Sequence, residues 1–296
     1  MTTERDAGDG LATPPQASWI RRNAWWLGIG VALICASYVA LRYADSWLVY
    51  LLKNSQVRDV AALNARLQKL GPTVSEIGRV EYDGVAMPML AARRLVTGAT
   101  RRLCIIAGVH GNEPAGVEAA ARLAEKAIGD PALYPGLNLL IVPLANPWGW
   151  SRNLRYSGAN QDVNRGFAAG KGAEVLIITD LLARERCDGL VDLHGDRARR
   201  EFSVITYDNP DLATARALTV EVAAQGIALR AGMPDGVFTR GIDDAASRAR
   251  PTLALYARQH GTRFVYVVES PRRLEFETRV RLHLLAIDRL SRGVGA

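Results

Sequence analysis

The fold is decided by residues 103–114, which read LCIIAGVHGNEP. The run from Leu103 to Val109 is short, continuous and apolar, as in a strand buried within a sheet. Helical spacing follows from Glu113 to Ala127, so the stretch predicts a strand that gives way to a helix. In open α/β sheets, ligands bind beyond the carboxyl ends of the strands. We therefore expect the chemistry of the protein at this junction.

The same alternation continues along the chain. Further buried strands are predicted at Leu137–Leu144, Gly189–Leu193, Phe202–Tyr207 and Phe264–Val268, and further helices at Ala173–Arg186 and from about Glu275 to Leu290. Asp83-Gly84 separates two short apolar runs, which is a strong signal for a β-hairpin turn. Strands that alternate with helices predict a mostly parallel sheet covered on both faces.

The composition excludes several classes of protein. Of the 296 residues, 49% are hydrophobic and 23% charged, which excludes global disorder. The net charge of +7 does not indicate nucleic-acid binding, because the arginines are scattered among acids and only Arg197, Arg199 and Arg200 form a short basic cluster. The three cysteines form no C-x-x-C pair and no even set, which argues against a disulfide scaffold and a cysteine zinc finger.

The N-terminal part predicts a membrane anchor. Residues 1–23 are polar and are expected to form a disordered tail. Residues 24–42 are expected to form a transmembrane helix, because Ala24–Leu41 carries no charge and its 18 residues cover about 27 Å as a helix. A buried helix of the soluble domain and a cleaved signal peptide are the alternatives. Residues 43–75 are expected to form a helical juxtamembrane linker, and residues 76–296 a single large domain.

The charge flanking the apolar run predicts the orientation of this anchor. Arg21 and Arg22 directly precede the run. Positive residues favour the cytoplasmic side. We therefore expect a single-pass protein of the inner membrane whose large domain lies on the non-cytoplasmic side.

Two strand ends carry the residues of a metal site. His110 and Glu113 are three residues apart across a turn into a helix, and His194 ends the apolar run at Val191–Leu193. Two histidines and one glutamate, with a fourth position left open, are typical of catalytic zinc. The alternative is a histidine that caps a strand and a glutamate that favours a helix start. The other two histidines, His260 and His283, are interpreted as structural.

A third strand end and one irregular segment complete the candidate site. Glu269 ends the strand at Phe264–Val268, where its carboxylate could move a proton during hydrolysis; a capping or salt-bridged glutamate is the alternative. The segment after Asn146-Pro-Trp-Gly149 carries an asparagine and several arginines, which could clamp a carboxylate, or could be a solvated loop. The polar residues of this segment are Arg152, Arg155, Asp162, Asn164 and Arg165.

Together these motifs resemble the zinc carboxypeptidase family and its relatives, the succinylglutamate desuccinylases and aspartoacylases. The matching segments occur in the family's order between about residues 100 and 275: His110-Gly-Asn-Glu113, Asn146-Pro-x-Gly149, Arg155 with Asp162-Val-Asn164-Arg165, Asp192-Leu-His194 and Val268-Glu269-Ser270. The resemblance implies a three-layer α/β/α sandwich around a mixed, mostly parallel sheet.

The resemblance also implies a role for each site residue. His110, Glu113 and His194 would bind one zinc ion per chain, and Glu269 would be the general base and then the general acid. Arg155 would polarise the scissile carbonyl and hold its oxyanion. Asn164 and Arg165 would bind the terminal carboxylate of the substrate, and Asp162 would orient His110.

The motifs depart from the digestive carboxypeptidases in two respects. His-Gly-Asn-Glu is closer to the deacylases and to bacterial peptidoglycan peptide amidases. No motif identifies a tyrosine that caps the substrate, although Tyr207 and Tyr256 are candidates by type.

The leading hypothesis is a membrane-anchored zinc peptidase or amidase, in which zinc-activated water and a glutamate base cleave an amide bond next to a free carboxylate. A deacylase of N-acyl amino acids and a catalytically silent binding module are the alternatives.

Overall fold

The computed structural model describes residues 25–26, 29–38, 57–130, 132–196, 200–233, 235–249 and 251–295. The chain separates into two units, Met1–Leu48 and Val49–Ala296. In the first unit, residues 25–26 and 29–38 are helical. The predicted tail 1–23 lies outside the described residues, as do the ends of the predicted transmembrane helix 24–42. Among the residues described, no helix is both long enough and apolar enough to cross a bilayer.

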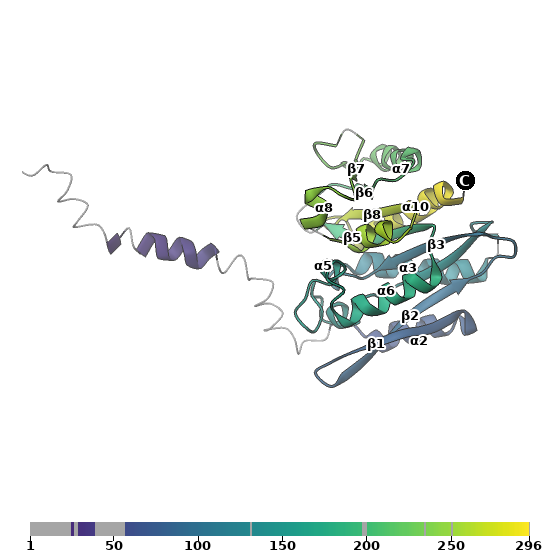
Figure 1. Cartoon of the computed structure of the whole chain (residues 1–296), viewed down its shortest axis with the longest axis horizontal. Helices are drawn as coiled ribbons and strands as arrows, with labels where there is room; N and C mark the ends of the chain where they lie inside the picture. The colour runs from purple at the N-terminus through teal and green to yellow at the C-terminus, as the bar shows by residue number, and fades with distance from the viewer. Residues whose placement is uncertain are drawn as a thin grey trace, which may run out of the picture. The chain divides into compact units, whose positions relative to one another are not determined.

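The second unit is built on one sheet, and its described strands run in the order β1-β2-β4-β3-β5-β8-β6-β7 (Figure 1). Their bounds are β1 Val74–Tyr82, β2 Val85–Arg94, β3 Arg101–Ala107, β4 Leu137–Val142, β5 Gly189–Asp196, β6 Ser203–Tyr207, β7 Val237–Arg240 and β8 Phe264–Pro271. The central strands β4, β3, β5 and β8 are parallel, whereas β1, β2 and β6 add antiparallel pairings. The predicted mixed sheet, mostly parallel at its centre, is confirmed.

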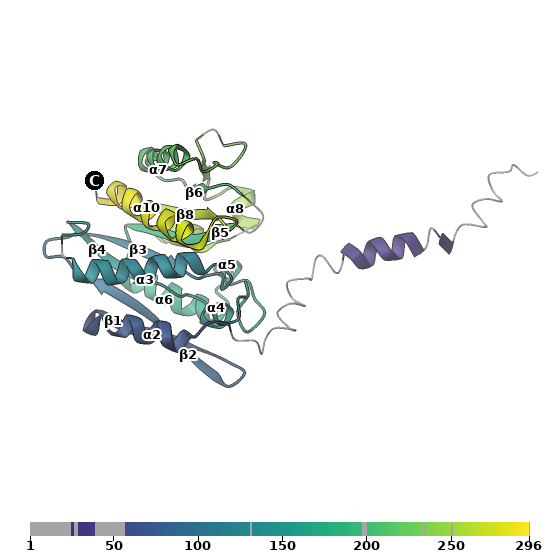
Figure 2. The ribbon, with the colours of Figure 1, turned by 180° about the vertical axis from the view of Figure 1, so that it is seen from behind.

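Helices cover both faces of the sheet. Figures 1 and 2 show α3 and α10 on one face and α6 on the other. The helices are α2 Val60–Gln68, α3 Pro114–Gly129, α4 Pro147–Ser151, α5 Val163–Gly166, α6 Ala173–Glu185, α7 Ala213–Ala224, α8 Ala245–Ala249, α9 Leu253–Gln259 and α10 Phe276–Gly295, with a 3-10 turn at Gly71–Thr73. Because the central strands are covered on both sides, residues 103–107 are fully buried, which explains their continuous apolar run.

The predicted hairpin is present and forms the edge of the sheet. β1 and β2 pair in antiparallel fashion up to Tyr82 opposite Val85. Asp83 and Gly84 both have positive φ, 53° and 73°, as a two-residue type I′ turn requires. The hairpin therefore follows from local sequence alone.

The domain begins earlier than residue 76. Helix α2 lies within the predicted linker 43–75, of which residues 43–56 are outside the described part. Asp59 caps α2 by accepting a hydrogen bond from the Ala62 amide. Val60, Leu63 and Leu67 of the helix are buried in the common core. The described end of the predicted linker is thus packed as part of the domain, because its apolar face covers the sheet.

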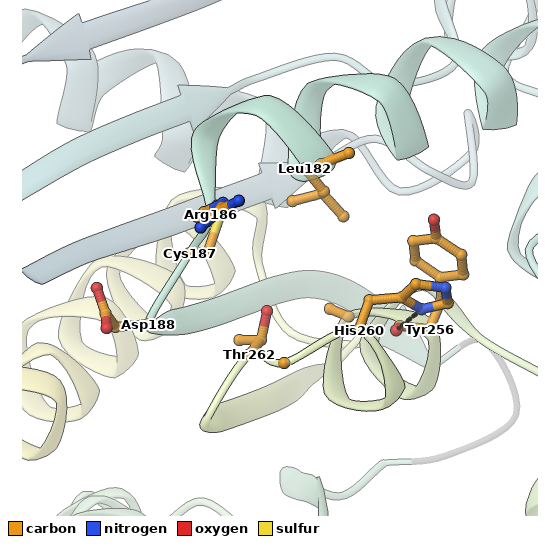
Figure 3. Close-up of a pocket in the computed structure, with 10 residues that line it drawn as sticks. Leu182, Arg186, Cys187, Asp188, Tyr256, His260 and Thr262 are labelled. Carbon is orange, nitrogen blue, oxygen red and sulfur yellow. Dashed lines mark hydrogen bonds between the residues drawn. The ribbon is translucent and has the colours of Figure 1, made fainter.

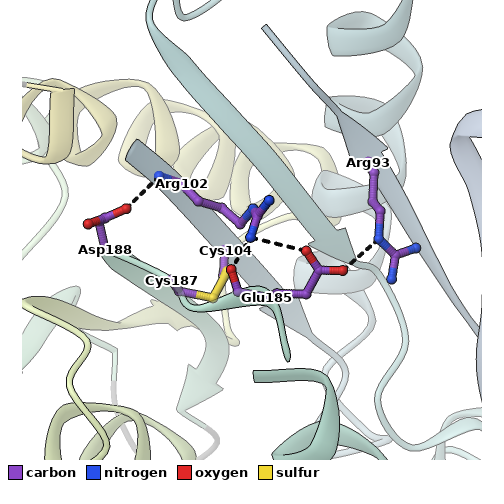
Figure 4. The surroundings of a disulfide bond; sticks show 6 residues. All are labelled: Arg93, Arg102, Cys104, Glu185, Cys187 and Asp188. Carbon is purple, nitrogen blue, oxygen red and sulfur yellow. Dashed lines mark hydrogen bonds and ion pairs between the residues drawn. A yellow bond between two sulfur atoms is a disulfide. The ribbon is translucent and has the colours of Figure 1, made fainter. Parts of the chain in front are cut away.

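The structure contains a disulfide bond that the sequence analysis did not predict. Cys104 in β3 and Cys187, just before β5, are bonded, with their Cα atoms 5.8 Å apart (Figure 4). The two residues are 83 positions apart, and only the parallel pairing of β3 with β5 brings them together. Beside the bond, the Glu185 carboxylate binds the guanidinium groups of Arg93 and Arg102. The odd number of cysteines argued against a disulfide scaffold, but it does not exclude a single disulfide bond.

Reduction of this disulfide should destabilise the domain. The bond joins residues 83 positions apart, and the loop-entropy relation gives a loss of about 4.5 kcal/mol in the free energy of unfolding. The measurement is urea unfolding of a Cys35→Ser variant with and without dithiothreitol. A Cys35→Ser/Cys104→Ala/Cys187→Ala variant is the control, since dithiothreitol should not change its midpoint. An unchanged midpoint in the first protein would contradict the disulfide.

Candidate metal centre

Two adjacent strands deliver the candidate ligands to one edge of the sheet. β3 lies beside β5, with Ala107 opposite Leu193, so the loop that follows β3 reaches His194 directly. That loop turns tightly, because the Glu113 amide donates a hydrogen bond to the His110 carbonyl. Gly111 is required there, since a Cβ would overlap the backbone of Gly149. The predicted convergence of His110, Glu113 and His194 therefore follows from strand order and one close backbone approach.

The three side chains meet at one buried point. The Nδ1 atoms of His110 and His194 lie 3.0 and 2.9 Å from the two carboxylate oxygens of Glu113, and 3.0 Å from each other. All three residues are at most 6% exposed, and their ligand atoms lie within 4.8 Å of one another. The Gly195 amide also donates to Glu113 Oε2, which fixes the carboxylate against the end of β5.

A different aspartate lies next to the Nε2 atom of each imidazole. Asp162 Oδ1 lies 3.3 Å from His110 Nε2, and Asp192 Oδ2 lies 2.9 Å from His194 Nε2. Carboxylates in these positions favour an Nε2–H on each ring, which leaves the Nδ1 lone pairs turned toward the common point. Two lone pairs 3.0 Å apart repel each other unless a proton or a cation lies between them.

The donor set fits zinc. Two imidazole nitrogens and one carboxylate are the ligands of catalytic zinc sites, in which a further position remains for water or substrate. The residues present thus match the predicted cofactor by donor type, by burial and by the outer carboxylates.

The charged groups of the cluster shift the pKa values of one another. Burial alone would lower the pKa of His194, but Asp192 and Glu113 raise it well above its usual value. Burial would raise the pKa of Glu113, but His110 and His194 lower it well below its usual value. The opposite charges of His194 and Glu113 therefore stabilise each other within the cluster.

Arg155 lies at the rim of this cluster. Its guanidinium group binds Asp162 Oδ2 through Nε and Nη2, at 3.0 and 2.9 Å. Nη1 lies 3.3 Å from His110 Nδ1 and 3.9 Å from Glu113 Oε1. Burial raises the pKa of Asp162, but His110 and Arg155 outweigh that effect and lower it. The structure thus brings Arg155 and Asp162 to His110.

Glu269 lies on the other side of His194. The two residues are direct register partners in the parallel pair β5–β8. Burial raises the pKa of Glu269 to about 7; His194 opposes this shift, and the negative charges of Glu113 and Asp196 add to it. A carboxyl group that ionises near neutral pH is suited to accepting and returning a proton.

Asn164 lies beside the cluster, and both Asn164 and its neighbour Arg165 contact the segment before α9. Asn164 Nδ2 is 3.4 Å from His194 Nε2, and its Oδ1 accepts a hydrogen bond from the Leu253 amide. The exposed Arg165 donates through Nη1 to the carbonyl of Pro251, at 2.8 Å. Both residues therefore connect the metal centre to the start of α9.

The remaining sequence candidates lie elsewhere. Tyr256 and His260 stack on each other and line a cavity of about 450 Å³ that also includes Cys187 (Figure 3). Tyr207 is buried and accepts a hydrogen bond from the Thr252 hydroxyl. His283 is buried in α10 and is not among the three clustered ligand residues. Arg197 and Arg199 lie outside the described residues.

Asp192 is the site residue that sequence reasoning missed. It was quoted only as part of a motif, although residues i and i+2 of a strand lie on the same face. Asp192 and His194 therefore had to share a face of β5. Asp192 is fully buried, and its carboxylate lies against the Nε2 atom of the candidate ligand His194.

Comparison with known proteins agrees with this geometry. The family model of the succinylglutamate desuccinylase/aspartoacylase catalytic domain matches residues 99–236. No significant match to the chain is found among curated proteins.

Solved structures share the fold. A protein from Shewanella denitrificans OS217 named as a metallopeptidase superimposes with a TM-score of 0.66 at 22% identity, over 80% of this chain and 91% of that one. A metallo-carboxypeptidase from Burkholderia cenocepacia gives 0.60 at 22% identity, over 79% and 68%. A metallo-carboxypeptidase from Pseudomonas aeruginosa, in complex with (2-guanidinoethylmercapto)succinic acid, gives 0.58 at 22% identity, over 78% and 67%.

Replacing Asp192 with asparagine should weaken metal binding. An amide cannot supply the negative charge that holds the His194 Nε2–H, so we expect zinc affinity to fall about 10–100-fold. The measurement is competition with a chromogenic chelator. Asp180→Asn, on the exposed side of α6, is the matched control and should bind zinc like the unmodified protein. Equal affinity of the folded Asp192→Asn protein would contradict the role of Asp192.

Proposed function

We propose that the chain belongs to the zinc carboxypeptidase-like superfamily and is a zinc-dependent hydrolase that cleaves an amide bond next to a free carboxylate; the match to the desuccinylase/aspartoacylase domain and the shared fold support this proposal. The single observation that carries the proposal is the meeting of His110, Glu113 and His194 at one buried point, with Glu269 beside His194. A binding protein has no need of an ionisable carboxyl group at that place.

The proposed chemistry divides between the cofactor and the protein. Zinc, when bound by His110, Glu113 and His194, supplies a Lewis acid that polarises a carbonyl group and acidifies water. Glu269 accepts the proton of the attacking water and then donates it to the leaving nitrogen. Burial raises the pKa of Glu269 to about 7, which suits this carboxyl group to both roles.

Arg155, Asn164 and Arg165 act on the substrate. Arg155 has its Nη1 at the rim of the cluster, where it stabilises the negative charge that develops on the carbonyl oxygen. Arg165 is exposed and donates a hydrogen bond to the Pro251 carbonyl, and its guanidinium group can also make a charge-assisted bond with a substrate carboxylate. Asn164 adds an amide donor beside it.

Peptides with a free carboxylate are our first substrate class. Deacylation of N-acyl amino acids is the second, and one observation favours it: residues 99–236 match the desuccinylase/aspartoacylase domain. Both reactions use every residue named above. A panel of cell-wall peptides and of N-succinyl and N-acetyl amino acids, tested with zinc-loaded protein, separates them by the substrates that are cleaved.

Substitution of Glu269 by glutamine tests the reaction itself. The amide keeps the size of the side chain but cannot accept the proton, so kcat should fall by about 10²–10⁴ on whichever substrate of the panel is cleaved. Zinc content should stay at one ion per chain, because Glu269 is outside the ligand set. Unchanged turnover would remove Glu269 from the base role. Binding without hydrolysis by the unmodified protein would instead indicate a catalytically silent binding module.

We also propose that the domain is anchored in the inner membrane and faces the non-cytoplasmic side. The uncharged run Ala24–Leu41 after Arg21 and Arg22 supports an anchor with this orientation. The disulfide between Cys104 and Cys187 supports the same side independently, because disulfides persist in oxidising compartments and are rare in the cytosol. Exported peptides would then be the accessible substrates.

Protease access tests this placement. Trypsin added to intact spheroplasts should digest the domain, while a cytosolic marker protein stays intact. Digestion only after lysis would overturn the orientation. Recovery of the domain in the soluble fraction, without detergent, would overturn the anchor.

A further inference from the structure

The segment between α4 and α6 has little regular structure of its own. Residues 152–172 contain only the short helix α5, yet they carry Arg155, Asp162, Asn164 and Arg165. Asp162 and Arg155 must meet His110 at hydrogen-bond distance. A displacement of about 1 Å at such groups is enough to cost a large part of the activity. Something outside the segment therefore has to fix its position.

Tyr82 contacts the middle of this segment and the two helices that flank it, α4 and α6. Its ring lies edge-on to Trp148 of α4, with the ring centres 6.2 Å apart. The same ring lies against Gly158, where a Cβ would overlap it. Its hydroxyl donates a hydrogen bond of 2.8 Å to Glu174 in the first turn of α6.

The contact with Gly158 lies in a turn between Arg155 and Asp162. The Ser157 amide donates to the Gln161 carbonyl and the Asn160 amide to the Ser157 carbonyl, so residues 157–161 form a closed turn. Arg155 precedes this turn and Asp162 follows it. A ring packed on Gly158 therefore fixes the position of this turn, and with it the backbone positions of Arg155 and Asp162.

The hydrogen bond between Tyr82 and Glu174 is stabilised by burial. Glu174 is fully buried, and one of its carboxylate oxygens has no other partner among the described residues. Burial raises the pKa of Glu174 and also that of Tyr82. The phenol therefore keeps its proton at neutral pH and remains a donor to this carboxyl group. Loss of the hydroxyl would remove the side-chain donor of the buried Glu174, which is costly.

We propose that Tyr82 is a positioning residue for the metal centre: its ring and hydroxyl hold residues 152–172 so that Asp162 and Arg155 meet His110. The role rests on the proposed function for its catalytic consequence, but its effect on metal binding does not. It also gives the β1–β2 hairpin, which lies at the far edge of the sheet from β8, a part in the chemistry.

Three variants test this role. Tyr82→Phe removes only the hydroxyl, and Gly158→Ala displaces the ring. We expect zinc affinity to fall about tenfold in the first and further in the second, because the orientation of His110 by Asp162 is lost. Glu174→Gln keeps an oxygen that accepts the Tyr82 hydrogen bond and should bind zinc within about twofold of the unmodified protein. Val80→Ala, in the same strand and fully buried, is the control for a general loss of stability.

The measurements separate positioning from mere destabilisation. Zinc affinity is measured by chelator competition, and the melting temperature of each variant is recorded beside it. Val80→Ala should lower the melting temperature and leave zinc affinity unchanged. On a cleaved substrate, Tyr82→Phe should lower kcat more than it changes KM. Unchanged zinc affinity in folded Tyr82→Phe and Gly158→Ala proteins would overturn the proposal.

The experiments also distinguish failure of the proposed function from failure of the role of Tyr82. If the unmodified protein binds zinc but cleaves nothing on the panel, the hydrolase fails and the affinity differences still decide the role of Tyr82. If it binds no zinc, the Nε–H resonance of Arg155 decides. This proton, bonded to Asp162, should be protected from exchange in the unmodified protein and lose protection in Gly158→Ala. Equal protection in both proteins would overturn the role of Tyr82.

Discussion

The whole arrangement depends on β3, β5 and β8 being parallel neighbours. Parallel strands end at the same edge, so His110, His194 and Glu269 reach one place although 159 positions separate the first from the last. The pairing of His194 with Glu269 fixes the lateral distance between the metal cluster and the carboxyl group beside it. A shift of one residue in that register would turn one of the two side chains to the opposite face. Burial of both faces by helices keeps the register unique.

Charge balance explains why this place is suited to a divalent cation. Glu113, Asp162 and Asp192 are three carboxylates around two imidazoles, and Arg155 supplies one positive charge. With neutral imidazoles, the cluster carries two uncompensated negative charges in a buried place. Buried charge without a partner is costly. Protonation of His194 relieves this in the metal-free protein, and a dication would relieve it completely.

Sequence reasoning succeeded where the signal was local and failed where it depended on tertiary contacts. The apolar run before His110 and the Asp83-Gly84 turn predict their elements directly, because burial on two faces and positive φ each leave a local mark. The Cys104–Cys187 bond left none, since its partners meet only after β3 and β5 pair. Tyr82 was equally invisible: its contacts with Gly158 and Glu174 join an edge hairpin to a distant loop.

The contacts of Asn164 and Arg165 connect the metal centre to the start of α9. The Arg165 guanidinium group donates a hydrogen bond of 2.8 Å to the Pro251 carbonyl, and Asn164 accepts one of the same length from the Leu253 amide. Under the proposed function, a substrate carboxylate would be a stronger acceptor for Arg165 than this carbonyl, because a charge-assisted bond is roughly twice as strong. The start of α9 would then hold both side chains in place before a substrate carboxylate arrives.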